Sequence, residues 1–489
     1  PNHTWEKVVF DAWRQETWDV NDTVLIFDPQ ADADVGDFFS RLDPAEYLPT
    51  WFALRTAPAY AAAFMARYPH PTDRMNETRA AQKAQIHAAT PTVTYADTLG
   101  RAFLTVAQNQ YQYSDAPPAA PPVEEFQATR ILLDIEGNPR EVIDPMNRTI
   151  MRYDYDMLGN RIHQASMEAG GRWTLMDVAG KPLYAWDSRG HRFRTACDSL
   201  RRPTEAFLHE GLGAEMTIGR TVYGESFPNP ENNNLRGKVV QLFDQAGVVN
   251  SGPYDFKGNL LSTQRQLAQD YKNTLDWSGA VPLEPEIYTS RSRFDALNRP
   301  IQMIAPHSDQ PGAGINVIQS IFNDANLLEQ VHVWFNQAAE PAAWLDHATA
   351  DLHAVTDIDY NSKGQRVLID YGNGVRTTYQ YDPLTFRLMR LLTRRDAGTF
   401  PHDCPDPPPP GWPGCQVQNL RYTYDPAGNI THIRDDAQQA VFFQNQRVEP
   451  EADYMYDALY RLIEATGREH LGQAGGAPVP HPYNDAPRV

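Results

Sequence analysis

Short runs in which apolar and polar residues alternate recur along most of the chain, and turn-forming residues end each run. Segments 130–134 and 419–424 show this alternation, with β-branched and aromatic residues prominent. A period of two places successive side chains on opposite faces of a strand, so these runs predict β-strands. The pattern therefore predicts a mainly β chain.

One turn unit keeps returning between these runs. It consists of an aromatic residue, Asp, two variable residues, then Gly or Asn, often followed by a polar or basic residue. The clear copies contain Tyr155, Asp156 and Gly159; Tyr254, Asp255 and Gly258; Phe294 and Asp295; Tyr424, Asp425 and Gly428; and Tyr456 and Asp457. Looser copies start at Asp97, Asp134, Asp144, Asp177, Asp187, Asp198, Asp244, Asn323, Asn361 and Asp382. Neighbouring copies are often ten to twelve residues apart, or about double that, which is the spacing of a strand and a turn.

The chemistry of the unit explains why it predicts a hairpin turn. The Asp carboxylate accepts hydrogen bonds from the backbone of its own turn, and Gly or Asn supplies the left-handed conformation that the turn needs. The aromatic residue recurs at the same place in each hairpin, which predicts a ladder of rings along the sheet. We therefore interpret these residues as structural turn formers rather than as parts of one active site.

These units resemble the YD-repeats of the Rhs family. Segments 180–182, 185–191, 371–375 and 433–437 also look like parts of the insecticidal Tc-type B and C toxin components and of related SpvB-containing toxin proteins. The resemblance covers residues from about 91 to about 470. It implies a long antiparallel β-hairpin strip that curves into part of a hollow shell, and such shells enclose a cytotoxic C-terminal polypeptide.

The resemblance also implies partners. These would be the C-terminal toxin cargo, the remaining shell in the same or a partner chain, and a pore-forming toxin component. It places the chain outside the cell, as part of a larger secreted toxin.

The first ninety residues follow a different pattern. Trp5, Trp13 and Trp18 occur where turn copies are few, and the Ala-rich segments 61–67 and 77–85 have helix-forming composition. We expect a mixed strand and helix segment over residues 1–90, the β-repeat region over 91–470, and an exit linker over 471–489 that leads to a C-terminal region outside this sequence.

Composition and charge narrow the function classes. The formal charge is −19, which repels phosphate backbones and makes nucleic acid an unfavourable partner. No apolar run is long enough to span a membrane. Cys404 and Cys415 flank a Pro-rich segment in which a disulfide would close a small surface loop, but the spacing leaves both the bridged and the reduced states open.

The search for chemistry yields no catalytic, cofactor-binding or metal-binding residue. Asp435 and Asp436 are adjacent on a predicted strand and would point to opposite faces, whereas Asp357 and Asp359 share a face but lead into a turn unit. Residues 425–428 read Asp-Pro-Ala-Gly, like the self-cleavage motif of Rhs proteins, but an ordinary repeat precedes them and further repeats follow. We assign no cofactor and no enzymatic role.

Three function classes remain. The leading one is a segment of a toxin-enclosing shell. A carbohydrate or cell-surface binding module would require Tyr and Trp rings exposed together on one face, and a hidden enzyme would require clustered carboxylates with shifted pKa values in a cleft.

Overall fold

The structure is a computed structural model that describes residues 2–468 apart from 118–119, 397, 401–415 and 444–445. The chain divides into two compact units. Unit 1 comprises residues 1–149 and 375–489, and unit 2 comprises residues 150–374. Residues 401–415 and 469–489 are outside the described part of the chain. Cys404, Cys415 and the predicted exit linker fall within these two ranges.

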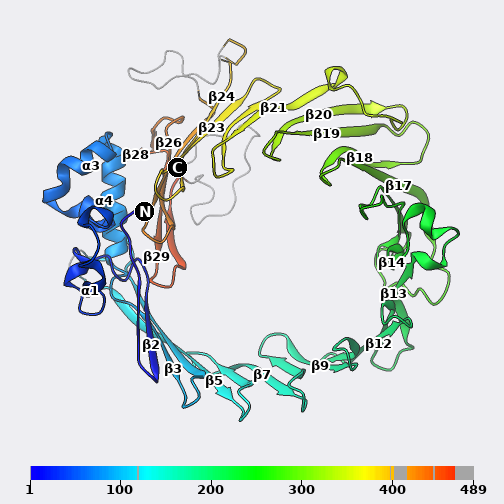
Figure 1. Ribbon diagram of the computed structural model, residues 1–489, viewed down its shortest axis with the longest axis horizontal. Coiled ribbons are helices and arrows are strands. Elements are labelled where there is room, and N and C mark those ends of the chain that lie inside the picture. The colour runs from blue at the N-terminus through cyan, green and yellow to red at the C-terminus, as the bar shows by residue number, and fades with distance from the viewer. Residues whose placement is uncertain (1, 118–119, 397, 401–415, 444–445, 469–489) are drawn as a thin grey trace. The chain divides into compact units, whose positions relative to one another are not determined.

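Unit 2 is an antiparallel meander in which each strand pairs with the next one along the chain (Figure 1). Its strands are β7 (Thr149–Tyr155), β8 (Arg161–Ser166), β9 (Gly170–Met176), β10 (Pro182–Asp187), β11 (His191–Cys197), β12 (Pro203–Glu210), β13 (Met216–Tyr223), β14 (Val239–Asp244), β15 (Gly247–Ser251), β16 (Ser262–Ala268), β17 (Leu283–Phe294), β18 (Pro300–Ser308), β19 (Ile315–Phe322), β20 (Leu328–Gln337), β21 (Leu352–Tyr360) and β22 (Arg366–Tyr371). In such a meander every second connection falls on the same edge of the sheet.

Unit 1 contains two further runs of antiparallel strands. The first run is β1 (Lys7–Phe10), β2 (Arg14–Trp18), β3 (Thr92–Ala96), β4 (Ala102–Tyr111), β5 (Val123–Leu133) and β6 (Pro139–Ile143). The second is β23 (Arg376–Tyr381), β24 (Leu388–Arg394), β25 (Gln418–Tyr424), β26 (Ile430–Asp435), β29 (Glu451–Tyr456) and β30 (Leu462–Thr466), with a separate small hairpin of β27 (Val441–Phe443) and β28 (Gln446–Val448).

The helices of unit 1 lie between β2 and β3 in the sequence. They are α1 (Gly36–Phe39), α2 (Trp51–Thr56), α3 (Ala61–Arg67) and α4 (Pro71–Gln85). The predicted mainly β fold with a small helical insert near the N-terminus is therefore confirmed. Among the described residues, no helix has the length and apolar character needed to cross a membrane.

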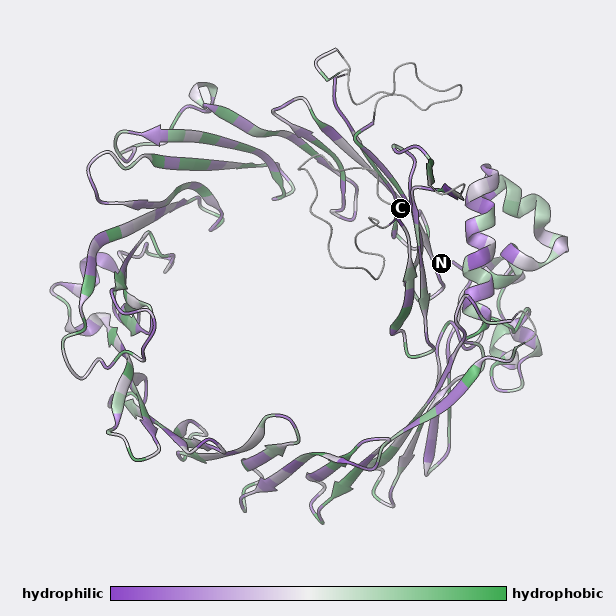
Figure 2. Cartoon of the chain, turned by 180° about the vertical axis from the view of Figure 1, so that it is seen from behind, coloured by the Kyte–Doolittle hydropathy of each residue, from purple (hydrophilic) through white to green (hydrophobic). Residues whose placement is uncertain are grey.

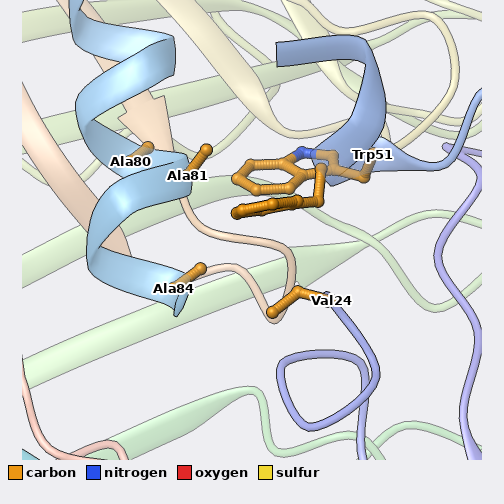
Figure 3. Packing of buried hydrophobic residues seen from close by; sticks show 6 residues of the cluster. Val24, Trp51, Ala80, Ala81 and Ala84 are labelled. Atoms are coloured by element: carbon orange, nitrogen blue, oxygen red, sulfur yellow. The ribbon is translucent and has the colours of Figure 1, made fainter. Parts of the chain in front are cut away.

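The helical insert provides the apolar core of unit 1. Three alanines of α4, Ala80, Ala81 and Ala84, are fully buried and let the helix approach Trp51 and Phe52 of α2 closely (Figure 3). The Lys83 ammonium group then ties α4 to the late strands, since it donates to the Asp453 carboxylate at 2.8 Å and to the Thr431 carbonyl at 3.0 Å. Large side chains at the alanine positions would push the helix away from α2.

The strands themselves bury little apolar surface. Most strand residues are half-buried, and hydrophilic and hydrophobic residues are interspersed along the strands (Figure 2). Unit 2 has two small buried clusters, one around Val248 and Trp277 and one around Ile304, Val317 and Trp334. Hydrogen bonds along the ladders and at the turns must therefore supply much of the order of these strands.

Candidate functional site: the repeated edge turn

The unit that begins at Tyr155 shows the geometry of the repeated turn. One carboxylate oxygen of Asp156, Oδ1, accepts from the backbone N–H groups of Leu158 and Asn160, both at 2.9 Å. The other oxygen accepts from the Asn160 side-chain amide at 2.9 Å. The Asp156 N–H donates to the Asn160 carbonyl at 3.0 Å, and Gly159 takes a φ of +77°. One carboxylate thus closes the whole turn.

A similar arrangement recurs at the turn aspartates of the other clear copies. Asp255, Asp295 and Asp457 each accept from the backbone N–H groups two and four residues on, and from the side chain four residues on. Asp425 accepts from the N–H groups of Gly428 and Asn429. The left-handed residues of these four turns are Gly258, Asn298, Gly428 and Tyr460.

The turn hydrogen bonds favour the ionised carboxylates. The side-chain hydrogen bonds from Asn160 and Asn259 lower the pKa of Asp156 and Asp255, respectively. At Asp97 the hydrogen bond from the Arg101 side chain lowers the pKa to about 2. These aspartates therefore act as charged acceptors at neutral pH.

The tyrosine before the Asp links neighbouring hairpins through its hydroxyl group. Tyr254 donates to the Val239 carbonyl at 2.9 Å, Tyr424 to the Leu388 carbonyl at 2.7 Å and Tyr456 to the Ile430 carbonyl at 3.0 Å. Each acceptor is the first residue of a strand that follows an earlier turn. For these tyrosines the link is thus a hydroxyl hydrogen bond, a role that the predicted ladder of rings did not include.

In unit 2 the turns on one sheet edge are also tied directly to each other. We call this the turn edge; its turns begin at Asp156, Asp177, Asp198, Asp255, Asp295, Asn323 and Asn361. The Arg201 guanidinium group lies 3.0 Å from the Asp177 carboxylate, and the Lys181 ammonium group donates to the Arg201 carbonyl at 2.7 Å.

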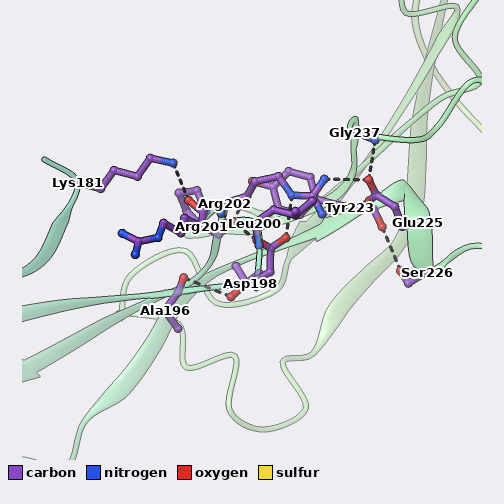
Figure 4. Close-up of polar contacts among 12 residues, drawn as sticks. Lys181, Ala196, Asp198, Leu200, Arg201, Arg202, Tyr223, Glu225, Ser226 and Gly237 are labelled. Atoms are coloured by element: carbon purple, nitrogen blue, oxygen red, sulfur yellow. Dashed lines mark hydrogen bonds and ion pairs between the residues drawn. The ribbon is translucent and has the colours of Figure 1, made fainter. Parts of the chain in front are cut away.

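Two further links continue along this edge. Arg202 pairs with Glu225 at 2.9 Å, next to the Tyr223 ring (Figure 4). The Asn259 amide donates to the Asn298 side chain at 3.0 Å. The residue four places after the Asp therefore often serves two turns at once.

The tips of the turn edge present apolar side chains to solvent. Met157 is 98% exposed and Val178 is 92% exposed. Leu158, Leu200, Phe256 and Leu297 are also strongly exposed, at the second or third position of their turns. A row of exposed apolar side chains is unusual on a water-facing edge and is typical of a surface that another element covers.

In unit 1 the N-terminal segment and β4 contact the repeat turns at Asp425 and Asp457. Asp425 and Asp457 are only 2% and 1% exposed. The Asn21 amide donates to the Asp425 carboxylate at 3.3 Å, and the Ala458 N–H donates to the Gln110 carbonyl at 3.0 Å. Residues 425–428 thus form a repeat turn whose Asp425 and Pro426 are buried, and the Asp425 carboxylate is occupied by Asn21 and by its own turn.

The densest carboxylates of the sequence also have structural partners. Asp435 accepts from the Asn419 backbone N–H at 2.8 Å, and the Asp436 carboxylate pairs with Arg421 and with Arg434. In unit 2, Asp357 and Asp359 lie on β21, and their register partners on β22 are Asp370 and Leu368.

Aromatic side chains do gather at one place on unit 2. Trp173 pairs in register with His163 and Trp186, and its ring stacks on that of His163 at 4.6 Å. This cross-strand row is the nearest approach to the ring platform that a carbohydrate-binding module would need.

The fold and the repeated turn define an antiparallel β-hairpin repeat protein in which most turn units of unit 2 lie on one sheet edge. Its sequence is 30% identical over 437 residues to the toxin subunit YenC2 of Yersinia entomophaga, and 26% identical over 400 residues to the toxin subunit YenC1 of the same organism. These matches cover 82% and 78% of this chain but only 41% and 38% of the relatives, so the chain spans about two fifths of their length.

Solved structures show the same fold. The Photorhabdus luminescens Tc holotoxin pore superimposes with a TM-score of 0.69 at 24% identity, over 95% of this chain and 18% of that chain. The TcdB2–TccC3 crystal structure gives a TM-score of 0.68 at 24% identity, over 95% of this chain and 19% of that one. No family model matches the sequence. The chain is thus similar to toxin subunits in sequence and shares its fold with solved Tc toxin structures.

Proposed function

We propose that this chain is a wall segment of a Tc-type toxin component of the YD-repeat (Rhs) type, and that its role is structural. Together with further polypeptide of the same or a partner chain, the wall encloses a C-terminal toxin polypeptide until delivery. The similarity to YenC2 over 82% of the chain is the observation that carries this proposal.

The geometry of the repeated turn supports a structural role. A wall needs many equivalent joints along its length, whereas an active site needs a single constellation. Each Asp carboxylate is used inside its own turn, and the residue four places on often bonds to the next turn as well. These turns therefore serve as joints between consecutive hairpins.

The exposed tips of the turn edge support the presence of partners. An apolar row that ends in solvent lowers solubility unless another surface covers it. We propose that further wall of the same or a partner chain covers the tips in the assembled toxin, with a pore-forming component as a second partner. We place the assembly outside the cell, as a secreted toxin.

Limited proteolysis of the full-length natural protein, purified with its partner subunit, tests the proposal. Polypeptide on the C-terminal side of residue 489 should resist a protease that digests it rapidly once the protein is unfolded. A Gly258→Val variant, which strains a joint of the wall, should shorten that protection, and the matched Gly279→Val variant should not. Equal digestion of this polypeptide in the native and the unfolded protein would rule out an enclosing wall.

A further inference from the structure

A row of four polar side chains crosses the sheet of unit 2 under a covering loop. Gln302, Gln319, His332 and His353 are register partners on β18, β19, β20 and β21. The first three are 1%, 0% and 3% exposed. Buried polar side chains of this kind need hydrogen-bond partners, and here the loop between β20 and β21 supplies several of them.

This loop, residues 338–351, folds back over the sheet, and we call it the strap. The Leu345 carbonyl accepts from the Gln319 amide at 2.8 Å, and the Leu345 N–H donates to Gln302 at 3.2 Å. The Trp334 indole N–H donates to the Thr349 hydroxyl at 3.1 Å. The side chains of Leu345 and Ala350 pack on the buried cluster of Ile304, Ile315, Val317 and Trp334. The strap therefore covers an apolar patch that is otherwise open on that face.

Three histidines meet where the strap crosses β20 and β21. The Nδ1 atoms of His332 and His353 are 2.8 Å apart, a hydrogen bond in which one ring donates and the other accepts. The ring of His347, on the strap, stacks on that of His332 with centroids 5.4 Å apart and planes 18° apart. Burial, followed by the charges of His353 and His347, lowers the pKa of His332.

The other charged groups around the strap are accounted for by contacts elsewhere. Asp346 accepts from the Ala348 N–H at 3.0 Å, and Asp351 accepts from the Phe335 N–H at 2.8 Å. Glu340 pairs with Arg291, and it lies 3.2 Å from His307. From β19 and β20, the side chains near His332 are the neutral amides of Gln319 and Gln330.

We propose that the His332–His353 pair is an acid-sensitive latch that holds the strap closed over the sheet. When both rings are neutral, they share one proton across the Nδ1 atoms. When acid protonates the accepting ring, both Nδ1 atoms carry hydrogen and face each other, and one ring of the pair beside His347 becomes positively charged. The pair then separates, the stack on His347 is lost, and the strap lifts from the buried cluster. The end of the strap at Glu340 remains attached through the ion pair of Glu340 with Arg291.

The sign of the effect follows from the lowered pKa of His332. The unfolded chain binds this proton near the ordinary imidazole pKa of about 6.5, whereas the folded chain resists it until a lower pH. The latch therefore contributes fully above about pH 6.5 and weakens as the pH falls from there through the lower pKa of the folded state. This inference concerns unit 2 alone and does not depend on the proposed toxin role.

Hydrogen–deuterium exchange of the whole chain at pH 7.5 and pH 5.5, corrected for the intrinsic pH dependence of exchange, tests the latch. Peptides covering residues 338–353 should exchange faster at pH 5.5 by a factor of about five to ten. In a His332→Gln and His353→Gln double variant this acceleration should disappear, because amides do not titrate. His209→Gln, on β12 of the same unit, is the matched control and should keep it.

If the double variant loses its native circular dichroism spectrum at pH 7.5, the exchange experiment is done on the single His353→Gln variant instead. Its amide oxygen can accept from His332 in either protonation state, so the acceleration should again be lost. Equal corrected exchange of the native strap at both pH values would overturn the proposal. Full acceleration in whichever of these variants folds would overturn it as well.

Discussion

Tyr460 donates a hydrogen bond from its hydroxyl group to the carboxylate of Asp19, a residue 441 positions earlier in the chain. Tyr460 occupies the left-handed position of the last described repeat turn, with a φ of +63°. The contact joins the N-terminal segment of unit 1 to its final hairpin. A left-handed backbone is energetically unfavourable for a bulky residue such as Tyr460. The hydrogen bond to Asp19, which glycine could not make, offsets this cost.

Tyr460→Phe should therefore destabilise unit 1 by about 1–2 kcal/mol, since it leaves the Asp19 carboxylate without this donor. Chemical denaturation followed by unit 1 tryptophan fluorescence measures the change. Tyr223→Phe is the matched control, because its hydroxyl bonds the Pro203 carbonyl in unit 2 at 3.1 Å. A Tyr460→Phe curve that matches the native one would show that the contact adds nothing.

Gly258→Val should destabilise the hairpin of β15 and β16 by about 1–3 kcal/mol. Gly258 has a φ of +89°, and a Cβ atom there would lie 2.8 Å from the Lys238 ammonium nitrogen. Gly279→Val is the control, since that position has open space and no left-handed backbone. Thermal unfolding of both variants provides the comparison, and an unchanged midpoint for Gly258→Val would refute the turn assignment.

Asp22 should make unit 1 less stable as the pH rises. Burial, together with the nearby Asp19, raises the pKa of Asp22 to about 6. The folded state thus holds a proton between the unfolded pKa of about 3.9 and pH 6 that the unfolded state has lost. The contribution of Asp22 is most favourable at low pH and declines until about pH 6.

Comparing native protein with Asp22→Asn isolates this effect from the turn aspartates. The variant should gain stability relative to the native protein by about 2–3 kcal/mol between pH 4 and pH 7. Urea denaturation at several pH values measures the difference. A difference that does not change with pH would mean that Asp22 titrates normally in the folded protein.

Replacing the apolar tips of the turn edge should reduce self-association of the isolated chain without changing its stability. Met157→Ser combined with Phe256→Ser removes two strongly exposed apolar side chains. Leu212→Ser is the control, because Leu212 is equally exposed but lies between β12 and β13, on the opposite edge. Sedimentation velocity at increasing concentration reports the association, and an equal effect of both changes would remove the special role of the turn edge.

The sequence predicts the turns well because each one is a local structure. The Asp156 carboxylate bonds only to residues within four positions, so the amino acids at those positions suffice to indicate it. The strands between the turns follow for the same reason, because their alternation is local. The roles assigned to these turn residues stay predictions until the variants above are measured.

Contacts between distant segments could not be predicted in this way. The burial of Asp425 beneath Asn21 and the strap over His332 both depend on which strands meet, and no local pattern encodes that choice. The hydroxyl link from Tyr424 to Leu388 was missed for a related reason. The recurrence of tyrosine indicated an aromatic role, whereas its hydrogen-bonding partner becomes apparent only once the register is known.

Because the strands bury little apolar surface, local unfolding should stay close to the hairpin where it begins. Each hairpin of unit 2 rests mainly on its two neighbours, so its stability is close to a sum of nearest-neighbour terms, as in a one-dimensional array. A broken joint in such an array loosens the adjacent hairpins and leaves remote ones intact. A destabilising substitution in unit 2 should therefore unfold the hairpins next to it first. Hairpins far from the substitution should stay folded.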